Sequence, residues 1–354
     1  MNAVCKTPRV HRPDLVEHSN RPELLQLIFQ PVNYGIFGFD TRAVALGTFL
    51  ISHGSLNIED DPYVKRLRQS PLSEEKLRAA IENGDTYCNK QLKRFLSRCF
   101  HICEELGPWA TDYFMSESIK RLRKSVHDQS IMMDWDEAEK AYLVRFLSSI
   151  PIPDIRLDFP AHEYPPVSPK LERLIQFLDE KYHPDFSGLV FVKQRATVSA
   201  MVKLLEVHPL MKDRFRCAAF VGYSSSGSRK ESLGDLHDVQ CQRDTLNEFR
   251  SGQRNLIIST DVLEEGIDIS ACSVVICYDK PPNLKSFIQR RGRARQKKST
   301  YAIMLTGDDE TSHLDRWQEL EKAMVQAYLD DERQPELFDD YEEVEERFLI
   351  ESTG

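Results

Sequence analysis

The chain has 354 residues, of which 41% are hydrophobic and 29% charged, the composition of a soluble globular protein with room for two or three domains. No apolar run approaches the roughly 20 residues of a membrane span, and the opening residues MNAVCKTPRVHRPDL lack the apolar core of a signal peptide. The eight cysteines include no Cys-x-x-Cys pair. We therefore expect buried thiols rather than a metal site, in a reducing compartment that is the cytoplasm or the nucleus.

Charge is unevenly distributed along the chain. The formal net charge is −9, but residues 308–354 carry 17 acidic and 4 basic side chains, so residues 1–307 sum to +4. Residues 285–298 contain seven Lys or Arg and no acid. An acidic tail therefore masks a locally basic body, which is compatible with binding nucleic acid.

The first 150 residues are typical of an all-α region. Residues 1–19 are polar and interrupted by proline, which predicts an entry segment without a core of its own. Residues 20–150 show helical periodicity and predict a bundle of about four or five helices. The first helix is expected from an Asn20 cap to Pro31 and the second from an Asp40 cap to His53. Two further apolar stripes cover residues 92–106 and 142–150.

Residues 136–139 read Asp-Glu-Ala-Glu, which looks like the start of a DEAD-type Walker B motif. That motif needs a buried strand before it and a Gly-x4-Gly-Lys-Ser/Thr phosphate loop upstream, whereas no Gly-Lys dipeptide occurs in this chain. We interpret Asp134 and Asp136 instead as the capped, acidic first turn of the helix that runs to Ile150.

The pattern changes after residues 151–168, whose prolines predict a linker. From residue 169 to residue 306, helical stripes alternate with short apolar β-branched runs. This alternation predicts right-handed crossovers and a mainly parallel sheet covered on both faces, as in a RecA-like α/β domain. The expected helices are 169–182, 196–207 and 239–250, and the expected strands are 188–192, 217–221, 256–259, 273–278 and 300–305. Residues 307–354 predict one more helix, at 314–328, and an acidic tail that ends before a further domain.

Three polar segments follow predicted strands or lie in the loops after them, where open α/β sheets place their ligand chemistry. The first, residues 191–195, carries two cations. The second, residues 259–269, contains a carboxylate beside a glycine turn, which suits a ribose. The third, in a predicted loop at residues 289–295, is an arginine cluster whose guanidinium groups match phosphate oxygens. The residues alone indicate a nucleotide and a nucleic acid.

In this order the three segments resemble motifs IV, V and VI of the C-terminal RecA-like half of superfamily 2 helicases. The finer resemblance is to the Dicer family, including its fungal Dicer-like members, and to the related antiviral RNA-sensing helicases, whose motif VI ends Gly-Arg-Ala-Arg as residues 292–295 do here. Those proteins insert a helical bundle beside the second RecA-like domain and carry a helical pincer after motif VI. The resemblance identifies residues 20–150 with the insertion and residues 307–354 with the pincer.

The resemblance also implies roles for single residues. Lys193, Arg195 and Thr260 would contact the backbone of double-stranded RNA. Glu265, Gly266 and Asp268 would bind the nucleotide, with Asp268 at the ribose. Gln289, Arg293 and Arg295 would face the ATP phosphates; Arg295 is the expected arginine finger and Arg293 the alternative. We expect Arg290, Arg291, Lys297 and Lys298 to be solvated charges or to follow phosphates.

The other half of the expected ATP site is not in this chain. In the resembling helicases the phosphate loop and the Mg²⁺-binding DExH motif belong to a first RecA-like domain, so ATP and Mg²⁺ are expected only together with that domain. The expected partners are double-stranded RNA, ATP and the first RecA-like domain, without a membrane. We expect the chain alone neither to hydrolyse ATP nor to unwind RNA, and it contains no ribonuclease III carboxylate cluster. The alternatives are an RNA-binding or regulatory fragment and one half of a DNA-translocating helicase.

Overall fold

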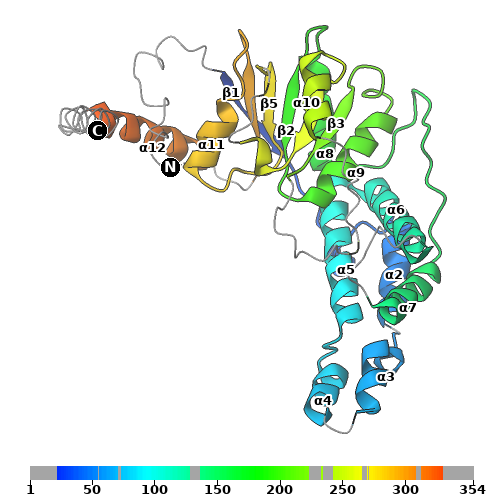
Figure 1. The fold of residues 1–354 in the computed structure, drawn as a ribbon. Coiled ribbons are helices and arrows are strands. Elements are labelled where there is room, and N and C mark those ends of the chain that lie inside the picture. Colours follow the sequence, from blue (N-terminus) through cyan, green and yellow to red (C-terminus); the bar gives the residue numbers. More distant parts are fainter. Residues whose placement is uncertain are drawn as a thin grey trace, which may run out of the picture.

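A wholly parallel six-stranded sheet with strand order β1-β6-β5-β2-β4-β3 forms the upper part of the molecule (Figure 1). The computed structural model describes residues 22–54, 56–70, 73–127, 136–222, 233, 242–264, 269, 271–307 and 312–329. The predicted RecA-like parallel sheet is confirmed. Its strands are β1 (Glu23–Phe29), β2 (Gly188–Phe191), β3 (Cys217–Phe220), β4 (Leu256–Ser259), β5 (Val274–Cys277) and β6 (Thr300–Thr306).

Successive side chains of each strand point to opposite faces of the sheet, and the two faces belong to two separate cores. In β4, for example, Ile257 lies in one core, whereas Leu256 and Ile258 lie in the other. Strands buried on both faces need apolar residues at every position, which is why these runs show no polar alternation.

The segment predicted as the first helix of the bundle is instead the edge strand β1. It pairs in parallel with β6 along its whole length, from Glu23 opposite Thr300 to Phe29 opposite Thr306. Leu25, Leu27 and Phe29 face one core, and Leu24 packs against the other. The apolar residues 24, 25, 27 and 28 fit a helical face and a strand equally well, and pairing with the distant β6 decides between the two. The inserted bundle therefore begins after β1, not at residue 20.

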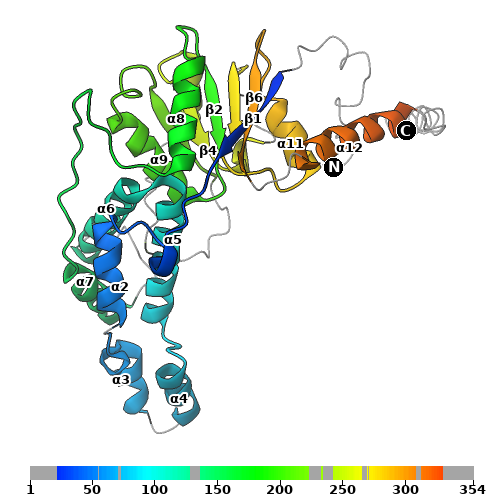
Figure 2. The ribbon, with the colours of Figure 1, turned by 180° about the vertical axis from the view of Figure 1, so that it is seen from behind.

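Helices cover both faces of the sheet (Figures 1 and 2). Helices α8 (Pro169–Lys181) and α9 (Arg195–Val207) pack on one face, and α10 (Gln242–Arg250) and α11 (Leu284–Arg291) pack on the other. Helix α12 (Ser312–Leu329) follows β6 in the chain and packs against α11, where Trp317 contacts Phe287 with ring centroids 5.3 Å apart.

The chain between β5 and β6 was predicted as a loop, but residues 284–291 form α11. Asn283 caps it by accepting a hydrogen bond from the Ser286 N–H, and the fully buried Phe287 holds it against the sheet. The first two arginines of the cluster therefore lie on the last turn of a helix.

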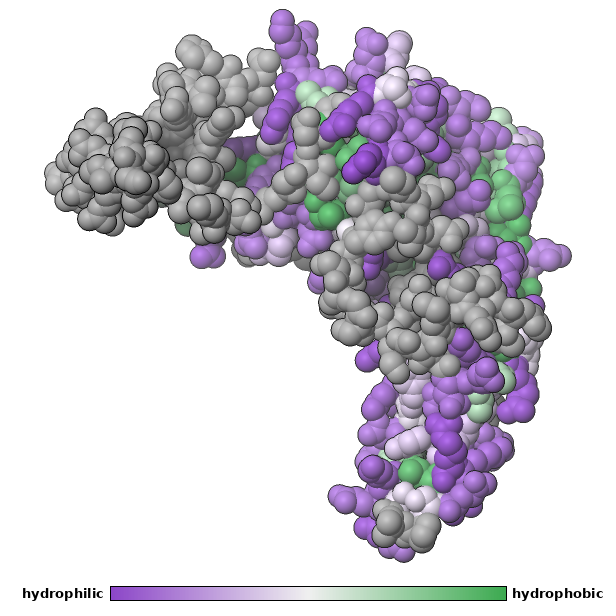
Figure 3. Space-filling model, in the orientation of Figure 1, coloured by the Kyte–Doolittle hydropathy of each residue, from purple (hydrophilic) through white to green (hydrophobic). Residues whose placement is uncertain are grey.

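Six helices form the bundle below the sheet (Figure 1), where four or five were expected. The core of α2, α5, α6 and α7 is continuous with the core under α8 and α9, whereas α3 and α4 have a small core of their own. The stripes predicted at 92–106 and 142–150 are confirmed, and the bundle surface seen in Figure 3 is mostly hydrophilic. The helices are α2 (Val44–Gly54), α3 (Pro62–Arg68), α4 (Glu74–Glu82), α5 (Tyr87–Leu106), α6 (Pro108–His127) and α7 (Glu137–Ser148).

Two capping predictions have different outcomes. The Asp136 carboxylate accepts from the N–H groups of Ala138 and Glu139 and so begins α7, as the cap interpretation of this acidic run required. Asp40 was expected to cap α2 but pairs with Arg42. The first N–H groups of α2, those of Val44 and Ala45, donate instead to Asp112 of α6. Burial raises the pKa of Asp112 to about 6 against these two stabilising hydrogen bonds.

Residues 151–168 contain no helix or strand, as expected for a linker, and they run along the bundle back to α8 (Figure 1). Where the linker meets the turn between α5 and α6, Gly107 adopts φ +103° and lies against Val167 and Ser168; a Cβ atom there would meet their backbone at 2.6 Å.

The six cysteines described are all free and buried, as predicted. No helix within the described ranges is long and apolar enough to cross a membrane. The predicted entry segment and the acidic tail after residue 329 lie outside the described residues.

Candidate nucleotide and RNA interface

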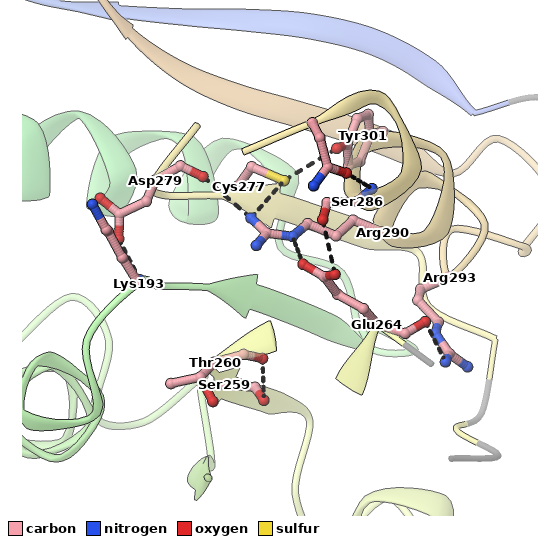
Figure 4. Close-up of polar contacts among 11 residues, drawn as sticks. Lys193, Ser259, Thr260, Glu264, Cys277, Asp279, Ser286, Arg290, Arg293 and Tyr301 are labelled. Atoms are coloured by element: carbon pink, nitrogen blue, oxygen red, sulfur yellow. Dashed lines mark hydrogen bonds and ion pairs between the residues drawn. The ribbon is translucent and has the colours of Figure 1, made fainter. Parts of the chain in front are cut away.

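The polar segments singled out in the sequence meet at the carboxyl edge of the sheet (Figure 4). Phe191 of β2 pairs in register with Ser259 of β4 and with Cys277 of β5. The residues that follow these three strand ends are therefore neighbours. Since neighbouring strands are about 4.8 Å apart, side chains from all three strand ends can contact one ligand.

Two exposed cations follow β2 in the motif IV segment, residues 191–195. The N–H of Lys193 donates to an Asp279 carboxylate oxygen at 2.5 Å, which holds the backbone while the lysine side chain stays exposed. Arg195 begins α9 and donates to the carbonyl of Gly222, after β3. Both side chains are exposed, and their predicted contact with the RNA backbone stays a prediction.

The motif V segment begins at Thr260, which is 6% exposed at the end of β4. A short 3-10 turn, Asp261–Leu263, follows and leads to Glu264. The Glu264 carboxylate accepts from Arg290 Nε at 2.6 Å and from Ser286 Oγ at 3.0 Å. Glu265, Gly266 and Asp268 lie outside the described residues, so their nucleotide-binding role stays a prediction.

Arg290, expected to be solvated, is a buried residue at the centre of this edge (Figure 4). Besides Glu264, its guanidinium donates to the Asp279 carbonyl at 3.3 Å and to Cys277 Sγ at 3.8 Å, and it lies 4.8 Å from the centre of the Phe191 ring. Burial raises the pKa of the Cys277 thiol, so this neighbour stays neutral. Arg290 therefore connects the motif IV, V and VI segments.

Arg291 has a structural partner too. Its guanidinium donates to both carboxylate oxygens of Glu321 on α12 and lies 5.4 Å from the Phe287 ring. The expectation that Arg290 and Arg291 are solvated or follow phosphates is wrong, because the last turn of α11 points both toward protein partners. Their spacing of three and four residues from the apolar Phe287 is the signal that could have placed them on a packed helix face.

The residues predicted to face ATP lie at different depths. Arg293 is 9% exposed and donates to the Glu264 carbonyl at 2.9 Å. Arg295 is exposed, and its Nε donates to the Gly292 carbonyl at 2.6 Å. Gln289 is half-buried on α11. Arg293 thus contacts the residue that immediately precedes Glu265, and Arg295 is the more accessible arginine.

The described residues contain no group of three or more His, Cys, Asp or Glu side chains placed to hold a metal ion.

Comparison with known proteins identifies the domain that contains this edge. Residues 169–297 match the family described as Helicase conserved C-terminal domain. Over the whole chain, the sequence is 54% identical to Dicer-like protein 2 of Aspergillus fumigatus and to Dicer-like protein 2-1 of Aspergillus niger. Dicer-like protein 2 of Phaeosphaeria nodorum is 35% identical over 99% of the chain. The chain contains the helicase C-terminal domain of a Dicer-like protein.

The helicase C-terminal domain accounts for only part of the relatives' length. The chain covers 25% of the Aspergillus fumigatus protein and 26% of the Aspergillus niger and Phaeosphaeria nodorum proteins. Among solved structures, the C-terminal domain of the DEAD-box protein Dbp5 is 21% identical with a TM-score of 0.33, over 43% of this chain and 77% of that one.

Proposed function

We propose that the chain is the second RecA-like half, with its helical insertion and pincer, of an ATP-dependent motor that binds double-stranded RNA in a Dicer-like protein of RNA interference and antiviral defence. The observation that carries the proposal is the pair of exposed cations, Lys193 and Arg195, at the carboxyl edge of the sheet beside Thr260. In this proposal Lys193 and Arg195 bind RNA phosphates without reading sequence, and Thr260 donates to a phosphate at the end of β4.

The nucleotide binds on the neighbouring side of the same edge in this proposal. Arg295 is accessible, and its Nη atoms have no protein partner among the described residues, so it suits an arginine finger that stabilises charge on the transferred phosphoryl group. Arg293 and Gln289 would position the phosphates, and Glu265, Gly266 and Asp268 would bind the nucleoside. Mg²⁺ neutralises phosphate charge and would be held by carboxylates of the first RecA-like domain.

Salt-dependent binding tests the RNA interface. We expect the chain to bind duplex RNA more tightly than duplex DNA of the same sequence at matched salt. Changing Lys193 and Arg195 together to Met should weaken RNA binding and reduce the slope of log Kobs against log salt by about 2, since each phosphate contact contributes about 0.9 to that slope. Titrations by fluorescence anisotropy at several salt concentrations measure both quantities.

The matched control is Lys203→Met, a cation about 12 Å further along α9, away from the carboxyl edge. It should leave both the affinity and the slope unchanged. An unchanged slope in the Lys193/Arg195 double variant, or an equal loss in Lys203→Met, contradicts the proposed interface.

A second candidate function is an RNA-binding or regulatory fragment that takes no part in catalysis. A phosphate-release assay separates the two. The chain alone with duplex RNA should release no phosphate under either function, whereas adding a first RecA-like domain should produce RNA-dependent release that Arg295→Ala abolishes. Turnover by the chain alone contradicts both, and no release with the added domain favours the fragment.

A further inference from the structure

The bundle meets the sheet at a buried cluster of three charges. Lys170, at the start of α8, lies between Glu105 at the end of α5 and Asp279 after β5. Its Nζ is 3.2 Å from an Asp279 carboxylate oxygen and is hydrogen-bonded to Glu105. The three side chains are only 11%, 14% and 18% exposed for Lys170, Glu105 and Asp279. One ammonium therefore connects the insertion to the carboxyl edge.

Aromatic and backbone contacts hold the same junction. The Lys170 ammonium lies 4.3 Å from the centre of the Tyr278 ring, and the Tyr278 hydroxyl donates to the carbonyl of Glu105. A cavity of 470 Å³ is bordered by Glu105, Lys170 and Tyr278, so tight packing does not close the junction on that side. The charged contacts thus act together with the shared apolar core in fixing the end of α5 against the sheet.

Asp279 contacts three other parts of the protein, and Figure 4 shows its contacts with Lys193 and Arg290. One carboxylate oxygen contacts Lys170, and the other accepts the backbone N–H of Lys193 at 2.5 Å. Its carbonyl accepts from Arg290 at 3.3 Å. Asp279 thus contacts α8 and the motif IV and VI segments directly. It is connected to the bundle through Lys170, which is hydrogen-bonded to Glu105.

Removing one charge from this cluster changes the positions of the other two groups. Two carboxylates share one ammonium, so loss of the ammonium leaves both carboxylates without this partner, and loss of one carboxylate lets the ammonium move toward the other. Either change alters the preferred positions of the groups that remain. Burial raises the pKa of Glu105 in spite of Lys170, which is consistent with a carboxylate that depends on this one cation.

We propose that Asp279 is a positioning residue: it couples the backbone of Lys193 and the guanidinium of Arg290 to the helical insertion through Lys170 and Glu105. A displacement of α5 then changes the position of Lys193 at the carboxyl edge. The significance of this coupling for RNA rests on the proposed function, in which Lys193 binds a phosphate, but the coupling itself is measurable without RNA.

Amide hydrogen exchange in a mutant cycle tests the coupling. In Glu105→Gln, the Lys193 N–H should exchange at least about threefold faster, because Lys170, no longer held between two carboxylates, shifts toward Asp279 and displaces the carboxylate that accepts this N–H. In an Asp279→Asn background, the same Glu105→Gln change should have no further effect on Lys193. The N–H of Val192 donates to the Ser259 carbonyl inside the sheet and is the internal reference, expected to stay unchanged in Glu105→Gln. NMR resolves the two neighbouring amides.

Glu104→Gln is the control, because Glu104 is an exposed acid next to Glu105 on the same helix turn. It should leave Lys193 exchange unchanged. The proposal is overturned if Glu105→Gln leaves Lys193 exchange unaffected, accelerates it equally in both backgrounds, or accelerates Val192 to the same extent. If Asp279→Asn does not fold, Lys170→Met takes its place in the cycle with the same expectation.

RNA binding then separates this inference from the proposed function. If both hold, Glu105→Gln weakens binding of duplex RNA by at least about threefold although Glu105 lies away from Lys193, and Glu104→Gln does not. If the unchanged chain binds no RNA, the exchange result still decides the coupling.

Discussion

The cations of the carboxyl edge fall into an inner group and an outer group. Arg290 and Arg291 are packed against Glu264 and Glu321, whereas Lys193, Arg195 and Arg295 project from the surface. The sequence-based prediction did not distinguish these groups, since all five lie in polar segments after predicted strands. The difference shows that one basic cluster can contain both packed and exposed cations, and that burial distinguishes the two groups.

The inner group should determine stability and the outer group ligand binding. An inner arginine compensates a buried carboxylate, so its loss leaves a charge without a partner. An outer cation has bulk water as its alternative partner, so its loss costs the fold little. Substitutions in each group test this division.

The largest effect is expected at Arg290. Arg290→Met should lower the free energy of unfolding by about 3–5 kcal/mol, because Glu264 keeps its charge while losing its main partner. Changing Glu264 to Met as well should recover part of this loss. Urea denaturation measures the free energy of unfolding of each variant. Arg295→Met is the matched change in the outer group, and its free energy of unfolding should stay within about 0.5 kcal/mol of that of the unchanged chain. Similar losses of stability at Arg290 and Arg295 would contradict the division into two groups.

His208 is a second kind of buried group, whose protonation should affect stability. It lies at the C-terminal end of α9 and is stacked on Tyr164, with ring centroids 5.1 Å apart. Burial lowers the pKa of His208 from 6.5 to about 4. The neutral form is therefore favoured in the fold, so its contribution is complete above pH 6.5 and is lost as the pH falls toward 4. The loss should be about 3–4 kcal/mol at roughly 1.4 kcal/mol per pKa unit.

His208→Asn isolates this contribution, because the new amide oxygen can accept the Leu210 N–H that now donates to Nδ1. The difference in unfolding free energy between variant and unchanged chain should depend on pH only between about 6.5 and 4. The exposed His162 provides the control His162→Asn. A pH-independent difference for His208→Asn would show that this histidine does not titrate as expected.

The smallest of the three effects is expected at Arg291. The pair with Glu321 is about one-fifth exposed on each side, and the contact of Phe287 with Trp317 supports the same junction. A double-mutant cycle of Arg291→Met and Glu321→Gln should give a coupling of about 1 kcal/mol, reflecting the docking of α12. Lys322→Met, at the exposed neighbour of Glu321, should show no coupling with Arg291→Met.

Much of the fold could be predicted because its signals are local. Residues 169–306 alternate helical stripes with short fully apolar runs, and the five strands expected there are present. The acidic run at 136–139 was recognised as a cap because a side chain accepting N–H groups two and three residues ahead is a local interaction.

The errors occurred where a distant residue decides the structure. The apolar pattern of residues 24–28 fits a helix as well as a strand, and only the pairing with β6, almost 280 residues away, makes it a strand. The cap of α2 comes from Asp112, more than 60 residues along the chain. Neither partner can be identified from local periodicity.

The sequence by itself determined the parallel α/β domain, the inserted bundle and the three motif segments, because periodicity, proline breaks and motif spacing are properties of short stretches. Only the tertiary structure decided which cations are buried, which strand closes the edge of the sheet, and that Asp279 contacts both α8 and the motif IV backbone. These features depend on contacts between residues far apart in the chain, and such contacts exist only once the sheet has brought its strand ends together.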